Sequence, residues 1–192
     1  METVFKTTVP EARDRLKRVE IEALPGTYEP GVVIIHALQP LEEVDVSVTD
    51  LVSNAGTIPA SMIDVRSVAF RLEMGQYRWG LFNETPMPDM PKFLEIKDKT
   101  AVAENANQPF WLTVNVPEVA KGGQYKGTVT VAADGQSMKL PFLVNVRDVK
   151  LDKAEGVMFS LYKRMGRSDK WLNETFADLR KHGATAIAIK GG

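Results

Sequence analysis

The stretch GQYKGTVTVAADGQSMKLPFLVNV, residues 123–146, decides the fold. In its first half Val129 and Val131 alternate with threonines. In its second half one face collects Met138, Leu140, Phe142, Val144 and Val146. A two-residue period is typical of strands with one buried face and one solvent face. Asp134-Gly135 separates the two runs and favours a tight turn, so residues 123–146 are predicted to form an antiparallel hairpin.

The same alternation occurs in shorter runs earlier in the chain, at residues 19–23 and 44–48. One slipped residue near Arg66-Ser67 indicates a β-bulge. Residues 32–35, Val-Val-Ile-Ile, are apolar on both sides, which predicts a central strand. Residues 83–91 hold three prolines and little periodicity, which predicts a loop. Short strands at this spacing are typical of a mainly β fold, a two-sheet antiparallel sandwich of immunoglobulin-like type.

The pattern changes after residue 151. An apolar run at residues 157–161 is followed by a helical pattern from Ser168, a candidate N-cap, to Gly183, a candidate C-terminal stop. Residues 184–189 form a second apolar run. Strand, helix and strand in this order predict a βαβ unit with a parallel pair. We therefore divide the chain into a sandwich domain, 1–151, and a βαβ segment, 152–192, that belongs to a larger α/β domain.

Composition excludes several classes of function. The 192 residues are 44% hydrophobic and 26% charged, with a formal net charge of -1, so nucleic acid and anionic membrane are not expected partners. The chain has no cysteine and two histidines, so thiol chemistry and Cys- or His-rich metal centres are excluded, and no cofactor is expected. No apolar stretch approaches the roughly 18 residues of a membrane span, and the N-terminus shows no signal-peptide core.

Three motifs resemble a known family. They are NQPFWLTVNVP at residues 107–117, GQYKGTVTV at residues 123–131, and Leu140-Pro141. Together they resemble the N-terminal β-sandwich of glycoside hydrolase family 123 and its relatives, in which a (β/α) barrel follows the sandwich. The resemblance makes residues 152–192 the start of a truncated barrel of TIM type. It also implies a bacterial protein, secreted or periplasmic, and hydrolysis of β-linked N-acetylgalactosaminides by the complete enzyme.

The resemblance implies that the catalytic carboxylates lie outside this chain. In the family they are an adjacent Asp-Glu pair well beyond the first two barrel strands. A full barrel needs about 250 residues, and only 42 follow residue 150. Glu42-Glu43 is an adjacent acidic pair, but it precedes a sandwich strand and does not match the family motif. No catalytic residue is therefore assigned, and the chain alone is predicted to be inactive.

Aromatic and strand-end residues are the candidates for binding a substrate. Tyr77 and Trp79 lie beside an irregular stretch and suit sugar stacking. Tyr162, Lys163 and Lys190 lie at the carboxyl ends of the expected barrel strands, where barrel enzymes build their sites.

Four other residues have a structural and a functional interpretation. Trp111 and Tyr125 either stack on sugar or fill the core, and Tyr125 fits a tyrosine corner, in which its hydroxyl bonds a nearby backbone group. His36 is expected to be a satisfied histidine of the core or rim, and His182 a helix C-terminal residue.

The function expected from the sequence is a non-catalytic scaffold for a carbohydrate-active barrel. A carbohydrate-binding module with Tyr77 and Trp79 in its loops is one alternative, and a structural or adhesion domain is another. A glycan is the expected ligand. The exposed βαβ segment is expected either to pack back onto the sandwich or to form a homodimer with a second copy, because unpaired parallel edges and uncovered apolar faces favour association.

Overall fold

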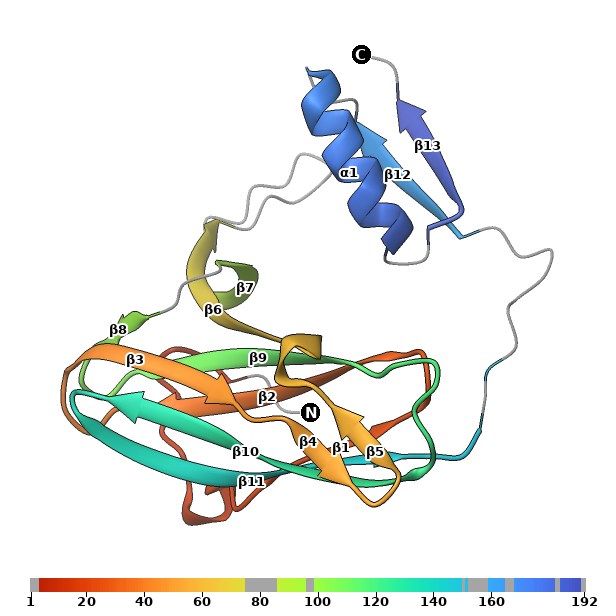
Figure 1. The fold of residues 1–192 in the computed structure, drawn as a ribbon. Coiled ribbons are helices and arrows are strands. Elements are labelled where there is room, and N and C mark those ends of the chain that lie inside the picture. The colour runs from red at the N-terminus through yellow and green to blue at the C-terminus, as the bar shows by residue number, and fades with distance from the viewer. Residues whose placement is uncertain are drawn as a thin grey trace. The chain divides into compact units, whose positions relative to one another are not determined.

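The computed structural model describes residues 4–74, 86–95, 99–149, 151, 159–164, 168–181 and 184–190. Its backbone divides into two compact units, Met1–Leu151 and Asp152–Gly192, which are described separately below (Figure 1).

The first unit contains a seven-stranded sheet. Its main path runs β1-β11-β10-β3-β8, and β4 and β5 extend it beside β10. β1 pairs with β11 in parallel, and every other pair of this sheet is antiparallel. The strands are β1 (Val19–Ala23), β3 (Leu41–Val48), β4 (Leu51–Ser53), β5 (Gly56–Ile58), β8 (Thr100–Val102), β10 (Gly123–Ala133) and β11 (Gln136–Val146).

The second sheet of this unit is four-stranded and antiparallel, in the order β2-β9-β6-β7. Its strands are β2 (Tyr28–His36), β6 (Ile63–Met74), β7 (Pro86–Glu95) and β9 (Asn107–Asn115). Two short 3-10 helices, Ala12–Asp14 and Ala60–Met62, lie in the connections. Figure 1 shows β2 and β9 on one side of the unit and β10 and β11 on the other.

The hydrophobic core lies between the two sheets. Alternate residues of several strands enter it, so that β9 contributes Leu112 and Val114 and β11 contributes Phe142 and Val144, all fully buried. The cluster of buried hydrophobic residues that forms this core contains residues from both sheets. The structure therefore confirms the predicted fold class, a mainly β two-sheet sandwich.

The predicted hairpin and the predicted bulge are both confirmed. β10 and β11 pair along their whole length, ending at Ala133 opposite Gln136. Asp134 and Gly135 have φ of 46° and 80°, so both central residues of the turn are left-handed, as a type I′ turn requires. In β6 the register with β7 shifts between Ser67 and Val68, one residue beyond the point where the alternation slips.

Two local predictions were wrong. Residues 32–35 lie in β2, which is an edge strand of the four-stranded sheet and not a central one. Val33 faces the core at 3% exposure, whereas Ile34 points outward at 40% exposure. The prolines of residues 83–91 do not prevent a strand, because β7 begins at Pro86. β7 is also an edge strand, where a proline costs no ladder hydrogen bond if its nitrogen faces solvent.

The second unit has the predicted order of strand, helix and strand. β12 (Ser160–Arg164) pairs in parallel with β13 (Ala186–Lys190), and α1 (Asp169–Lys181) connects them. The amide of Ala184 donates to the carbonyl of Leu179 at 3.0 Å, which turns the chain from the helix toward β13. His182 and Gly183, the expected end of the helix, lie outside the described residues. Within the described part of the chain, no helix is long and apolar enough to cross a bilayer.

Candidate functional site

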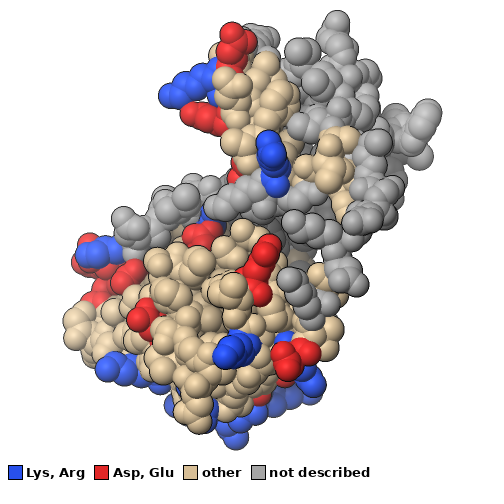
Figure 2. Space-filling model, turned by 45° about the vertical axis from the view of Figure 1, so that its right-hand side comes forward, with Lys and Arg blue, Asp and Glu red and all other residues tan. Residues whose placement is uncertain are grey.

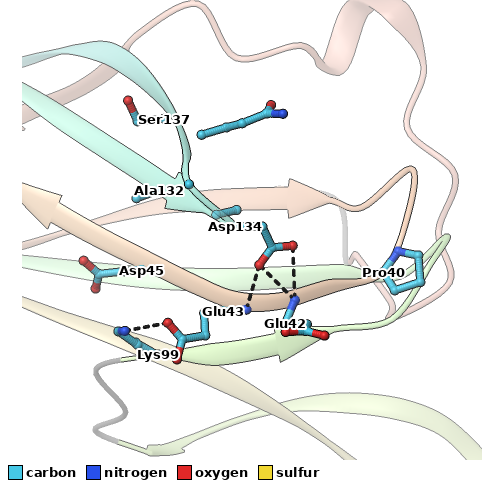
Figure 3. A pocket seen from close by; sticks show the side chains of 11 residues that line it. Pro40, Glu42, Glu43, Asp45, Lys99, Ala132, Asp134 and Ser137 are labelled. Atoms are coloured by element: carbon cyan, nitrogen blue, oxygen red, sulfur yellow. Dashed lines mark hydrogen bonds and ion pairs between the residues drawn. The ribbon is translucent and has the colours of Figure 1, made fainter.

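An open hollow on the first unit collects acidic side chains. We call it the acidic hollow; its volume is about 770 Å³. Glu42, Glu43 and Asp45 come from β3, Asp134 from the β10–β11 turn, and Lys99 from the residue before β8 (Figure 3). Among the described residues, four carboxylates and one ammonium group therefore line it. Figure 2 shows charged side chains of both signs interspersed over the visible surface.

Two of these carboxylates have structural partners. Asp134 accepts hydrogen bonds from the backbone N–H of Glu42 at 3.2 Å and of Glu43 at 3.2 Å, so it fastens the hairpin turn to the start of β3 (Figure 3). Glu43 pairs with the Lys99 ammonium, and this hydrogen bond and charge raise the pKa of Lys99.

The acidic hollow does not have the environment of a glycosidase active site. Glycosidases raise the pKa of a general acid by burying it, whereas Glu42, Glu43 and Asp134 are exposed and Asp45 is only half-buried. Among the described residues no group of three His, Asp or Glu side chains could hold a metal ion. The hollow can offer hydrogen-bond acceptors to the hydroxyl groups of a ligand.

A second hollow, of about 510 Å³, is mainly apolar, and we call it the apolar hollow. Leu41, Phe70 and Val102 are among its apolar walls, and Lys6 and Asn107 add polar groups. Pro40 and Glu42 line both hollows.

Asn107 is the polar residue that sequence reasoning missed. The residue is buried, with 3% of its surface exposed. Its side-chain Nδ2 donates hydrogen bonds to the backbone carbonyls of Phe5 at 2.8 Å and Thr8 at 2.7 Å. Its Oδ1 lies 2.9 Å from Nδ1 of His36. Because Oδ1 is an acceptor, His36 carries a hydrogen on Nδ1. His36 is thus the satisfied rim histidine that the sequence predicts.

Of the two aromatic residues with open interpretations, Tyr125 is structural. It is 1% exposed, and its hydroxyl donates to the carbonyl of Lys121 at 3.0 Å. This confirms the tyrosine-corner interpretation and excludes sugar stacking, since a buried ring offers no face to a ligand.

Trp111 lies on the outer face of the four-stranded sheet and is half-buried. Its register partners are Val32 on β2 and Arg66 on β6. Arg66 pairs with Asp64 through Nε and Oδ2 at 2.6 Å. The cross-strand neighbours of Trp111 are therefore the aliphatic Val32 on one side and Arg66, with its ion pair, on the other.

The outer face of the seven-stranded sheet is polar by contrast. Asn145 donates to Glu22 at 2.8 Å and to Glu20 at 3.1 Å, and Arg147 pairs with Glu22 at 2.7 Å. The hydrogen bonds from Asn145 and Arg147 lower the pKa of Glu22. These side chains connect β1 to β11 and serve the parallel pairing of the two strands.

The predicted substrate-binding residues fall into two groups. Tyr77 and Trp79 lie outside the described residues. Tyr162 and Lys163 lie on β12 and Lys190 on β13, where Lys190 is in register with Arg164. The backbone brings the carboxyl ends of both strands to one end of the parallel pair, and a substrate role for these three residues stays a prediction.

Comparison with known proteins assigns the family. The model of the glycoside hydrolase 123 N-terminal domain matches residues 6–133. The chain belongs to this family. The predicted resemblance is therefore confirmed, and this member is a domain of a glycoside hydrolase. Among curated proteins, none has a sequence that matches the chain.

Solved structures agree with the fold of this family 123 N-terminal domain. A family 123 glycoside hydrolase from Clostridium perfringens, described for glycolipid glycan hydrolysis, superposes with a TM-score of 0.72 at 16% identity. The match covers 90% of this chain and 33% of that enzyme, so the chain spans about a third of its length. A CupB2 chaperone from Pseudomonas aeruginosa reaches a TM-score of 0.37 at 8% identity over 72% of this chain and 58% of its own, too low to inform function.

Proposed function

We propose that the sandwich is a non-catalytic scaffold for a carbohydrate-active (β/α) barrel. The observation that carries the proposal is the family match over residues 6–133, which lies entirely within the first unit. The chemistry of the acidic hollow supports it, because Asp134 and Glu43 serve the fold and three of the four carboxylates, Glu42, Glu43 and Asp134, are exposed. A rigid sandwich with its own core can hold a neighbouring catalytic domain without taking part in the reaction.

The βαβ unit is the proposed start of that barrel. Within the described residues β12 pairs with β13 alone, and parallel strands normally have neighbours and cover on both faces. Tyr162, Lys163 and Lys190 lie toward the carboxyl ends of these strands, where barrel enzymes build their sites. We assign them to the substrate cleft of the complete enzyme. If no further barrel strands pair with β12 and β13, the alternative is that two βαβ units pair with each other in a homodimer.

A hydrolysis assay tests the scaffold proposal. The purified 192-residue chain is incubated with a chromogenic β-N-acetylgalactosaminide, and release of the chromophore is compared with that of heat-denatured chain. The expected result is no turnover above the denatured control. Turnover that is lost in the double variant Glu42→Gln, Asp45→Asn would place catalysis in the acidic hollow and overturn the proposal.

A carbohydrate-binding module is the second candidate, and Trp111 is the observation that favours it. Aromatic rings stack on the apolar faces of sugars, and the neighbouring Asp64–Arg66 pair offers hydrogen-bonding groups to sugar hydroxyls. Titration with N-acetylgalactosamine and its β-linked oligomers, followed by tryptophan fluorescence or NMR, tests it. Binding that Trp111→Phe retains and Trp111→Ala loses supports the module. Binding unaffected by either variant contradicts a site at Trp111.

A further inference from the structure

The N-terminal residues 4–8, which we call the N-terminal strap, form a turn of their own. The amide of Thr8 donates to the carbonyl of Phe5 at 3.2 Å, and the amide of Phe5 donates to Oγ1 of Thr8 at 2.9 Å. None of the five residues is buried; Lys6 and Thr7 are exposed. Val4, Phe5 and Thr8 are half-buried, so hydrophobic burial secures the strap only in part, and terminal segments without other attachment are poorly ordered.

A single residue of the sandwich supplies three hydrogen bonds to the strap. The backbone amide of Asn107 donates to the carbonyl of Lys6 at 2.7 Å. Its side-chain Nδ2 donates to the carbonyls of Phe5 and Thr8, at 2.8 and 2.7 Å. Asn107 begins β9 and is buried, so these bonds are shielded from water and stronger for it.

His36 fixes the orientation of the Asn107 amide. It lies opposite Asn107 in the β2–β9 register, and its Nδ1 hydrogen bonds Oδ1 at 2.9 Å. Rotating the amide by half a turn would place Nδ2 against this donor and Oδ1 against the strap carbonyls. Both contacts would then be repulsive, so a single amide orientation holds the strap.

The strap is also a wall of the apolar hollow. Lys6 lines that hollow together with Leu41, Phe70 and Val102, and Asn107 lines it from β9. We propose that the strap is a movable wall: it opens and closes over the apolar hollow independently of the sandwich, and Asn107 holds it closed.

Hydrogen exchange of the unaltered chain in low urea tests whether the strap moves independently. The amides of Asn107 and Thr8 report on the strap. The amide of Val116, which donates to the carbonyl of Thr27 at 2.9 Å, lies just beyond the other end of β9 and reports on the sandwich. The expected result is that exchange at Asn107 and Thr8 is insensitive to low urea, since local opening exposes little surface. Exchange at Val116 should accelerate with urea. If all three amides accelerate with one slope, the strap opens only when the sandwich unfolds and the proposal is wrong.

Substitution of the holding residue gives the second arm. Asn107→Ala should accelerate exchange at Thr8 at least about ten-fold, since two hydrogen bonds are lost. The matched control is Asn115→Ala, at the other end of β9, whose side chain contacts the Met62 sulphur at 3.9 Å and not the strap. His36→Phe should accelerate exchange less than Asn107→Ala does. Unchanged exchange in Asn107→Ala would overturn the role of Asn107, and if that variant does not fold, the urea series alone decides.

Discussion

Removing the hydroxyl of Tyr125 should weaken the sandwich by a small, defined amount. The ring is 1% exposed, and the hydroxyl donates to the carbonyl of Lys121 at 3.0 Å. Tyr125→Phe keeps the ring and its packing and removes this one bond, which costs about 1 kcal/mol. Tyr125→Ala also removes the buried ring and should cost about 3–5 kcal/mol. The difference between the two variants separates the packing contribution from the hydrogen bond.

Urea denaturation followed by circular dichroism measures these costs, and the m-value should stay constant across the series. In thermal melts a loss of 1 kcal/mol should lower Tm by about 2–4 °C for a domain of this size. Lys121→Ala is the matched control, because the acceptor is the backbone carbonyl and survives truncation of the side chain. Equal stability of Tyr125→Phe and the unaltered chain would refute the tyrosine corner as a stabilising contact.

Three further perturbations follow from the structure. Gly127→Ala should destabilise by about 1–3 kcal/mol in urea titrations, since a Cβ there would lie 2.8 Å from the carbonyl oxygen of Asp50 and 2.8 Å from Leu51; no change would contradict this packing. The pKa of Glu22 is lowered in the fold, so its contribution is present above the unfolded pKa and lost as pH falls through the folded value; Glu22→Gln should flatten the acid limb of stability against pH. The pKa of Lys99 is raised in the fold, so its contribution to stability is present below the unfolded pKa and lost as pH rises through the folded pKa; Lys99→Met should flatten the alkaline limb of stability against pH. An acid limb that Glu22→Gln leaves unchanged would contradict the Glu22 shift, and an alkaline limb that Lys99→Met leaves unchanged would contradict the Lys99 shift.

The sequence predicts what depends on local pattern. Asp134-Gly135 between two alternating runs specifies the turn, because few residues adopt positive φ at both central positions. The slip in the two-residue alternation near Arg66-Ser67 identifies the bulge, because an extra residue in a strand shifts the following side chains to the other face. The order of strand, helix and strand after residue 151 also follows from periodicity alone.

What depends on tertiary neighbours was not predictable. The apolar run at residues 32–35 does not distinguish a central strand from an edge strand whose outer face adjoins Trp111. An edge strand such as β7 tolerates several prolines, and the residues of a strand do not by themselves determine its position in the sheet.

The candidate site was less predictable than the fold. Asn107 looks like any polar residue at the start of a strand, and its importance arises from segments about 100 residues away in sequence. The acidic hollow likewise joins β3 to a turn some 90 residues further on. No spacing motif connects such distant residues, although a polar residue in an otherwise buried position of β9 is a signal for which a sequence search could look.

Thermal unfolding of residues 1–151 alone tests the scaffold account most directly. A scaffold must fold without the βαβ unit, since its core is formed by its own two sheets. The account predicts a single cooperative transition, strand-dominated circular dichroism, and a Tm within a few degrees of the Tm of the sandwich transition in the whole chain. A non-cooperative melt, or a collapse of the spectrum on removing residues 152–192, would contradict it.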